Sequence, residues 1–275
     1  MLELEKASFR IGRAVLVEDI SFAVAPGSVT AVIGPNGAGK STSLRLLSGE
    51  VPPSTGKARL DGEALSAVGP EALARRRAVV AQRSELAFDF RVVDVVMMGR
   101  HPFNGGYPGP SDRRFAERAL TSVGLEAFSQ RRYLSLSGGE RQRVQIARSL
   151  VQLDGEDRGQ LPIRGGEAPP ARYWLLDEPT SALDLRHQHV LMAQCRERAA
   201  DGAGVLVVMH DLNLALRYAD HVVLMCAGRV HDQGPAEAVL TSKNLATVYG
   251  VAADVVAIPP ALTPQVVVRG SVAAP

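Results

Sequence analysis

The chain has 275 residues, of which 46% are hydrophobic and 22% are charged, and its formal net charge is +2. This composition predicts a globular protein with a sizeable core, as one large domain or two small ones. The net charge is too small to argue for a nucleic-acid partner, and no apolar run approaches the length of a membrane-spanning helix. Acidic residues at positions 3 and 5 argue against a signal peptide. Cys195 and Cys226 lack a disulfide or metal-ligand spacing, so we expect reduced thiols.

Short β-strand patterns dominate the first sixty residues. Residues 2–9 and 20–24 have the composition of strands, and the second segment alternates with a period of two. A further strand at residues 57–60 ends at Asp61-Gly62, a pair that favours a tight turn. We therefore predict a small antiparallel sheet beside a parallel one.

A glycine-rich loop follows a β-branched strand at residues 29–33 and precedes a short helix. Its glycines let successive backbone N–H groups surround an anion, and the helix N-terminus adds partial positive charge. Lys40 can reach the β- and γ-phosphates, and the Ser41 hydroxyl can ligate Mg²⁺. The sequence therefore predicts a phosphate loop that binds a nucleoside triphosphate. The predicted loop consists of Gly34, Pro35, Asn36, Gly37, Ala38, Gly39, Lys40, Ser41 and Thr42.

The next segment combines a strand with a long helical stretch. Residues 78–81 have the pattern of a buried strand that ends at Gln82, where α/β sheets place ligand-binding residues. From residue 84 to about residue 153, helical patterns replace strand patterns and predict a helical insertion. Phe88 and Phe90 lie in a predicted loop before it. Two interpretations are open: the rings fill the local core, which we favour, or they contact a partner.

Residues 136–142 read Leu-Ser-Gly-Gly-Glu-Arg-Gln at the start of a predicted helix. The two glycines leave this helix N-terminus open, which indicates a second anion-binding position. Residues 154–171 are rich in glycine and proline and predict an inserted loop.

A buried strand at residues 173–176 ends in Asp177-Glu178. Carboxylates on a core strand are costly unless charge or metal compensates them. Beside the phosphate loop, Asp177 can hold Mg²⁺ through water and Glu178 can polarise an attacking water molecule. The structural alternative is a salt bridge.

Another buried strand, at residues 205–209, ends at His210. Its position at a strand end favours a role near the γ-phosphate or the attacking water. His187 and His189 face different sides of a predicted helix, so we assign both to the surface. A hairpin is predicted across residues 222–232. The tail from residue 251 has an extended pattern and no assigned chemistry.

In this order, the motifs resemble the nucleotide-binding subunit of an ABC transporter over roughly residues 1–250. Residues 34–42 resemble the Walker A motif and residues 136–142 the ABC signature. Residues 173–178 resemble the Walker B motif with its catalytic glutamate. Gln82 resembles the Q-loop glutamine, residues 181–184 the D-loop and His210 the switch histidine.

The resemblance implies an α/β P-loop NTPase fold with an ABC ATPase domain at residues 1–250. A RecA-like parallel sheet with an N-terminal antiparallel β subdomain would span residues 1–83 and 160–250. An α-helical subdomain would be inserted at residues 84–159, and residues 251–275 would form a tail.

The resemblance also implies site residues and partners. Gln82, Glu178 and His210 would act in catalysis, and Ser41, Gln82 and Asp177 would hold Mg²⁺. Two copies would pair head to tail, so that each ATP also meets residues of the second copy, namely Ser137, Gly138, Gly139, Glu140 and Asp184. The homodimer would bind two permease subunits at the cytoplasmic face of the inner membrane, with no nucleic acid involved. Ile11 stands about where the family often stacks an aromatic residue on adenine, so we expect adenine to rest on aliphatic surface or on a neighbouring residue.

Finer similarities point to ATPases that import haemin, served indirectly by a periplasmic haem-binding protein. They lie at residues 34–37, 47–50, 75–79, 86–90, 99–102, 210–215 and 248–250. ATPases that power ferric-siderophore or cobalamin import share many of these features, so these two cargoes stay open as alternatives to haemin. A soluble ABC-type ATPase of translation or DNA repair is the alternative from another class. A P-loop kinase would not need residues 136–142.

Overall fold

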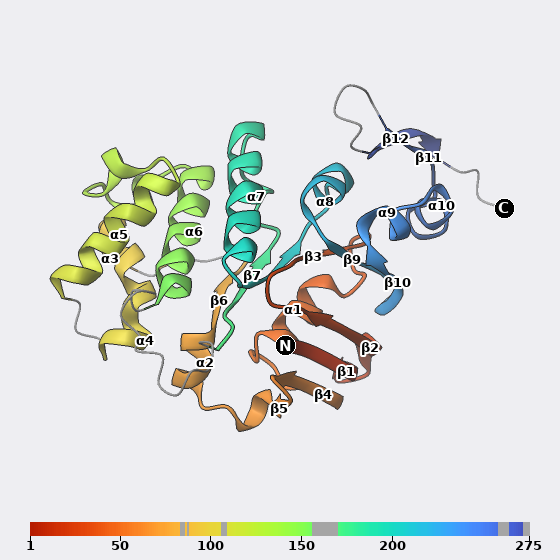
Figure 1. Cartoon of the computed structure of the whole chain (residues 1–275), viewed down its shortest axis with the longest axis horizontal. Coiled ribbons are helices and arrows are strands. Elements are labelled where there is room, and N and C mark those ends of the chain that lie inside the picture. Colours follow the sequence, from red (N-terminus) through yellow and green to blue (C-terminus); the bar gives the residue numbers. More distant parts are fainter. Residues whose placement is uncertain (83–85, 87, 106–108, 156–169, 258–263, 272–275) are drawn as a thin grey trace. The chain divides into compact units, whose positions relative to one another are not determined.

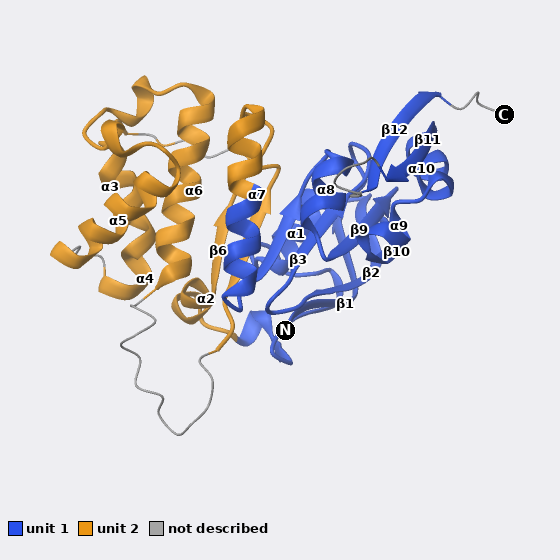
Figure 2. Cartoon of the chain, turned by 45° about the horizontal axis from the view of Figure 1, so that its top comes forward, with its two compact units in different colours: residues 1–67, 192–275 blue, residues 68–191 orange. Residues whose placement is uncertain are grey.

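The structure is a computed structural model of the chain, and it describes residues 1–82, 86, 88–105, 109–155, 170–257 and 264–271. Figure 1 labels its helices and strands. The chain divides into two compact units (Figure 2). Unit 1 consists of Met1–Ala67 and Met192–Pro275, and unit 2 consists of Val68–Leu191. The subdomain boundaries predicted at residues 83/84 and 159/160 stay predictions.

Unit 1 begins with an antiparallel sheet whose strands lie in the order β2-β1-β4-β5. Its strands are β1 (Leu2–Ile11), β2 (Ala14–Val24), β4 (Thr55–Leu60) and β5 (Glu63–Ala64). The turn at Asp61-Gly62 joins β4 to β5 as predicted, and both residues have positive φ. The short 3₁₀ helix η1 (Leu65–Ala67) follows.

A second group of strands in unit 1 lies in the order β10-β9-β3-β8. The buried strand β3 (Val29–Ile33) is parallel to both β8 (Gly204–Val208) and β9 (His221–Cys226), while β10 (Arg229–Pro235) is antiparallel to β9. Every residue of β3 and β8 is buried, as their β-branched composition requires. The predicted combination of an antiparallel sheet with parallel strands is thus confirmed.

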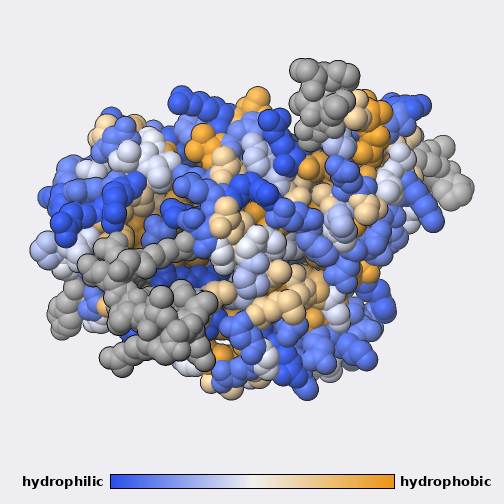
Figure 3. Space-filling view, in the orientation of Figure 1, coloured by the Kyte–Doolittle hydropathy of each residue, from blue (hydrophilic) through white to orange (hydrophobic). Residues whose placement is uncertain are grey.

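Short helices and a terminal hairpin complete unit 1. The helices are α1 (Lys40–Leu47), α8 (Leu212–Tyr218), α9 (Ala236–Val239) and α10 (Ser242–Tyr249). The hairpin pairs β11 (Val251–Ala257) with β12 (Pro264–Ser271), so the extended tail that the sequence predicts is an ordered two-stranded sheet. Figure 3 shows hydrophobic surface over this hairpin, where Val256, Val267 and Val268 are exposed.

Unit 2 combines two parallel strands with helices. β6 (Arg77–Val80) pairs with β7 (Tyr173–Asp177), and the Trp174 indole of β7 donates a 2.9 Å hydrogen bond to Ser149 of α6. The helices are α2 (Pro70–Arg76), α3 (Val92–Met97), α4 (His101–Asn104), α5 (Pro110–Ser122) and α6 (Gly138–Asp154), with 3₁₀ turns η2 (Met98–Arg100), η3 (Glu126–Phe128) and η4 (Tyr133–Ser135). Helix α7 (Leu185–Ala200) begins in unit 2 and ends in unit 1. No helix among the described residues is long and apolar enough to cross a bilayer.

A buried ion pair organises the helices of unit 2. Arg100 is only 4% exposed, and its guanidinium lies 2.8 Å from the Asp112 carboxylate and between the rings of Phe103 and Phe115. Burial raises the pKa of Asp112, but hydrogen bonds from Arg100, the Gly109 amide and Asn104 outweigh it, so the pKa lies below its ordinary value. Buried charges persist only when they are paired in this way.

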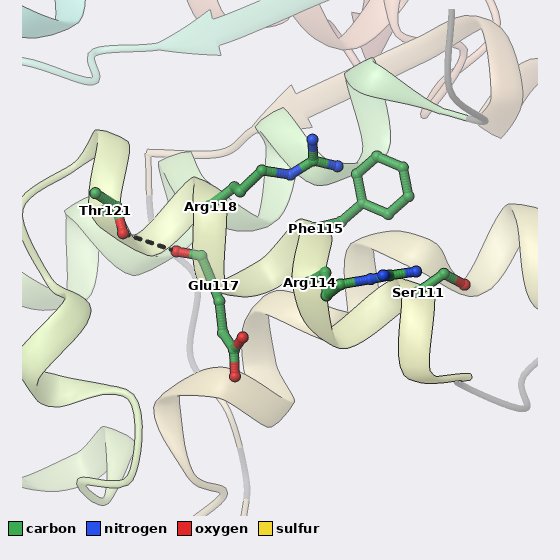
Figure 4. A pocket seen from close by; sticks show the side chains of 6 residues that line it. All are labelled: Ser111, Arg114, Phe115, Glu117, Arg118 and Thr121. Atoms are coloured by element: carbon green, nitrogen blue, oxygen red, sulfur yellow. Dashed lines mark hydrogen bonds between the residues drawn. The ribbon is translucent and has the colours of Figure 1, made fainter. Parts of the chain in front are cut away.

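A pocket of about 540 Å³ lies along α5 (Figure 4). Its described lining residues are Ser111, Arg114, Phe115, Glu117, Arg118 and Thr121. The Arg118 guanidinium lies 4.8 Å from the centre of the Phe115 ring, and the Thr121 hydroxyl donates to the Glu117 carbonyl within the helix. None of the site residues predicted from the sequence lines this pocket.

Candidate nucleotide site

The phosphate loop connects β3 to α1 in unit 1, as predicted. Gly34 and Gly39 have φ angles of +151° and +96°, and neither tolerates a side chain. A Cβ at Gly39 would lie 2.6 Å from a methyl group of Val17, and one at Gly34 would collide with the Met225 carbonyl of β9. The loop is therefore pressed against β2 and β9, and only its tip, at Asn36 and Gly37, is exposed.

Lys40 begins α1 and folds back over the loop. Its ammonium donates hydrogen bonds to the carbonyls of Gly34, at 2.9 Å, and Pro35, at 3.0 Å, and the residue is only 5% exposed. Among the described residues no side chain caps the N-terminus of α1. The first-turn N–H groups lack intrahelical acceptors and carry partial positive charge, so loop, ammonium and helix end together fit a polyphosphate.

His210 lies in the same unit, directly after β8. The Met209 amide donates to the Val32 carbonyl at 3.1 Å, which holds the end of β8 against β3. Because β3 and β8 are parallel, His210 and the phosphate loop leave the same edge of the strands. The His210 side chain is exposed, and Asp211 after it caps α8 by accepting from the amides of Asn213 and Leu214.

In unit 2 the structure brings Gln82 and Glu178 together. Parallel pairing of β6 and β7 places both just beyond the carboxyl ends of neighbouring strands, and the Gln82 amide nitrogen donates to the Glu178 carboxylate at 2.7 Å. Glu178 has a φ of +47°, a strained conformation for a residue with a side chain. The Ser181 hydroxyl donates to the Glu178 carbonyl at 3.0 Å, and Asp177 is buried at the end of β7.

The start of α6 is a complete capping box. Ser137 is the N-cap; its hydroxyl accepts from the Glu140 amide, and the Glu140 carboxylate accepts from the Ser137 amide at 2.7 Å. The hydrogen bond from the Ser137 amide lowers the pKa of the Glu140 carboxyl. A Cβ added at Gly138 would meet open space, whereas one at Gly139 would lie 2.8 Å from the Ala182 carbonyl. Residues 181–184 therefore pack against the first turn of this helix.

Asp184 has a partner that the sequence analysis missed. Its carboxylate accepts from the His187 amide at 2.9 Å and lies 2.7 Å from the His187 ring nitrogen. Hydrogen bonds from the amide and the ring of His187 hold the pKa of Asp184 below its ordinary value. The sequence analysis assigned His187 to the surface as one of a histidine pair. The spacing Asp-x-x-His at a helix start could have predicted its contact with Asp184, because an N-cap residue and the residue three positions later lie close together.

Comparison with known proteins assigns the chain to a protein family. A profile of the ABC transporter family matches residues 17–154, half of the chain. The chain belongs to the ABC transporter family. A hemin import ATP-binding protein of Rhizobium meliloti (strain 1021) is 42% identical over 91% of this chain and 91% of its own length. A protein of the same name from Gloeobacter violaceus is 42% identical, covering 98% of this chain and 95% of its own length.

A solved structure agrees with the family assignment. An inward-facing ABC transporter assigned to the metal-chelate type has a TM-score of 0.76 and 26% identity, covering 97% of this chain and 96% of that chain. The α/β P-loop NTPase fold predicted from the motifs is therefore confirmed. So is the resemblance to ABC transporter subunits from which it was inferred.

Two apolar positions of this ABC protein stand out near the site motifs. Ile11, at the end of β1, is 59% exposed and presents an aliphatic side chain; how adenine is held there stays a prediction. Phe88 is 71% exposed, and its ring packs edge-on against Phe90 with 6.2 Å between centroids. The interpretation that these two rings fill the local core is wrong, because Phe88 is largely exposed and Phe90 is 36% exposed.

Proposed function

We propose that the chain is the ATP-hydrolysing subunit of an ABC importer. The observation that carries the proposal is the Gln82–Glu178 hydrogen bond, found in a protein that also has a complete phosphate loop. A carboxylate just past a buried strand end, held by a neighbouring amide, has the chemistry to orient and polarise a water molecule. Lys40 and the amides of the loop hold the phosphates, and His210 positions the γ-phosphate or the water.

The residues proposed for Mg²⁺ supply the oxygen atoms that this ion prefers. Ser41 offers a hydroxyl and Asp177 a carboxylate. Gln82 uses its amide nitrogen toward Glu178, which leaves its amide oxygen as the ligand atom. When bound, Mg²⁺ would neutralise charge on the β- and γ-phosphates.

We also propose that two copies of the chain pair head to tail around ATP. Ser137 and Gly138 are exposed at the start of α6, and Gly138 has open space beside it. Backbone N–H groups of a helix N-terminus favour an anion. The second copy would thus supply Ser137, Gly138, Gly139, Glu140 and Asp184 to the nucleotide.

The proposed cargo is haemin, because both relatives described above are named hemin import ATP-binding proteins. The ATPase would bind two permease subunits at the cytoplasmic face of the inner membrane. A periplasmic haem-binding protein would act on the other side. The exposed Phe88 and Phe90 pair supports a contact with the permease, since exposed aromatic pairs favour interfaces.

Three experiments test these proposals. Glu178→Gln in the ATPase–permease complex should leave ATP binding intact and lower hydrolysis by about 10²- to 10⁴-fold; parental turnover in this variant would refute the role of Glu178. Deleting the gene should abolish growth on haem as the iron source and spare growth on ferric siderophores. The opposite pattern would favour a siderophore importer, and co-purification with ribosomes or DNA instead of a membrane protein would reject transport.

A further inference from the structure

The C-terminal hairpin is attached to the helix that follows His210. The Asn213 side chain of α8 accepts a hydrogen bond from the Val266 amide of β12 at 2.7 Å, and its own amide nitrogen lies 3.4 Å from the Val266 carbonyl. One side chain therefore pairs with both backbone groups of a strand residue, as a neighbouring strand would.

This contact is placed to act on His210. Asn213 lies in the first turn of α8, and its own amide donates to the Asp211 cap at 2.8 Å. Asp211 directly follows His210. A continuous series of contacts thus runs from β12 through Asn213 and Asp211 to the histidine.

Helix α8 depends on contacts with the rest of unit 1. It has seven residues, and helices this short are not stable without tertiary contacts. The hairpin buries Ala253 and Val266, while three of its valines face solvent (Figure 3), so its polar link to α8 matters for its attachment.

We propose that Asn213 is a positioning residue through which the C-terminal hairpin fixes the first turn of α8 and thereby the place of His210. The inference rests on the proposed ATPase function and on the role proposed for His210. The hairpin contributes no reacting group. It determines where the histidine backbone lies relative to the loop that holds the phosphates.

The test compares ATPase kinetics of full-length variants in the permease complex. Asn213→Ala removes both hydrogen bonds, and we expect kcat to fall at least about fivefold with KM for ATP within about twofold of the parent, because small displacements of a catalytic group act on turnover. Asn213→Asp is the matched control. It keeps the acceptor for the Val266 amide, which is the shorter hydrogen bond, and loses only the donor that faces the Val266 carbonyl, so kcat should fall clearly less than in Asn213→Ala.

Val266→Pro removes the same contact from the hairpin side, because proline has no N–H to donate to Asn213. The Val266 N–H points toward Asn213, and proline is tolerated where the N–H is directed away from the ladder. We expect the same loss of kcat as for Asn213→Ala. This second variant keeps the test decisive if Asn213→Ala fails to fold.

The His210→Ala background separates the two hypotheses. If Asn213 acts through the histidine, Asn213→Ala should cause no further loss of kcat in that background. The inference is overturned if kcat is unchanged in both Asn213→Ala and Val266→Pro, or if Asn213→Ala lowers kcat by the same factor with and without His210. If His210→Ala itself has parental kcat, the proposed role of His210 fails and the positioning inference fails with it.

Discussion

From the strained backbone at Glu178 we predict that two inactive variants of this residue differ in their free energy of unfolding. At a φ of +47°, a residue with a Cβ is disfavoured by about 1–2 kcal/mol relative to glycine, part of which the greater unfolded-state freedom of glycine offsets. Glu178→Gly and Glu178→Ala both lose the hydrogen bond from Gln82, so this loss cancels between them. We expect Glu178→Gly to be the more stable variant by about 1 kcal/mol, although both should be inactive.

The chain carries its own probe for this measurement. Trp174 is its single tryptophan, and it is fully buried in β7, four residues before Glu178. Urea unfolding followed by tryptophan fluorescence should place the midpoint of Glu178→Gly above that of Glu178→Ala with equal slopes, equivalent to about 2–4 °C in a thermal scan. Glu178→Gln keeps an acceptor for Gln82 and serves as the control. If Glu178→Ala and Glu178→Gly have the same urea midpoint, the backbone at this position is not strained.

Two further predictions use contacts of unit 2. Gly139→Ala should lower the free energy of unfolding by about 1–3 kcal/mol because its Cβ meets the Ala182 carbonyl, whereas Gly138→Ala, with open space, should not; equal urea midpoints for the two variants would contradict this packing. Asp112→Asn should destabilise the parent by about 3 kcal/mol at neutral pH, because it leaves Arg100 buried without its counter-charge. Since the folded state lowers the pKa of Asp112, the stability it contributes is complete above about pH 4 and is lost as the pH falls through the lower folded value. The parent's advantage over Asp112→Asn should therefore stay constant from neutral pH down to about pH 5 and shrink below about pH 4; an advantage that stays unchanged below about pH 4 would count against the ion pair.

The sequence was informative where one short segment determines the structure. Strand, glycine loop and helix follow one another between residues 29 and 47, so local periodicity and glycine spacing were enough to predict the phosphate loop. The start of α6 was likewise predicted from one short run, residues 136–142, although the capping box between Ser137 and Glu140 was not.

Contacts between distant segments could not be predicted in this way. Gln82 and Glu178 are in contact because β6 pairs with β7. The local sequence of either strand does not determine which strand it pairs with. The contact between Gly139 and Ala182 likewise depends on the tertiary arrangement. Phe88 was misjudged for a related reason: a loop aromatic is buried or exposed according to the path of its backbone, and composition does not define that path.

The position of Lys40 has a consequence for ligand discrimination. Its ammonium is already satisfied by the Gly34 and Pro35 carbonyls, so an incoming anion must offer more than these two acceptors before the lysine gains by turning to it. A single inorganic phosphate replaces contacts that the lysine already has, and its net gain is small. A triphosphate brings several charged oxygens to the lysine and the loop amides at once. The loop and its lysine therefore favour a triphosphate over inorganic phosphate.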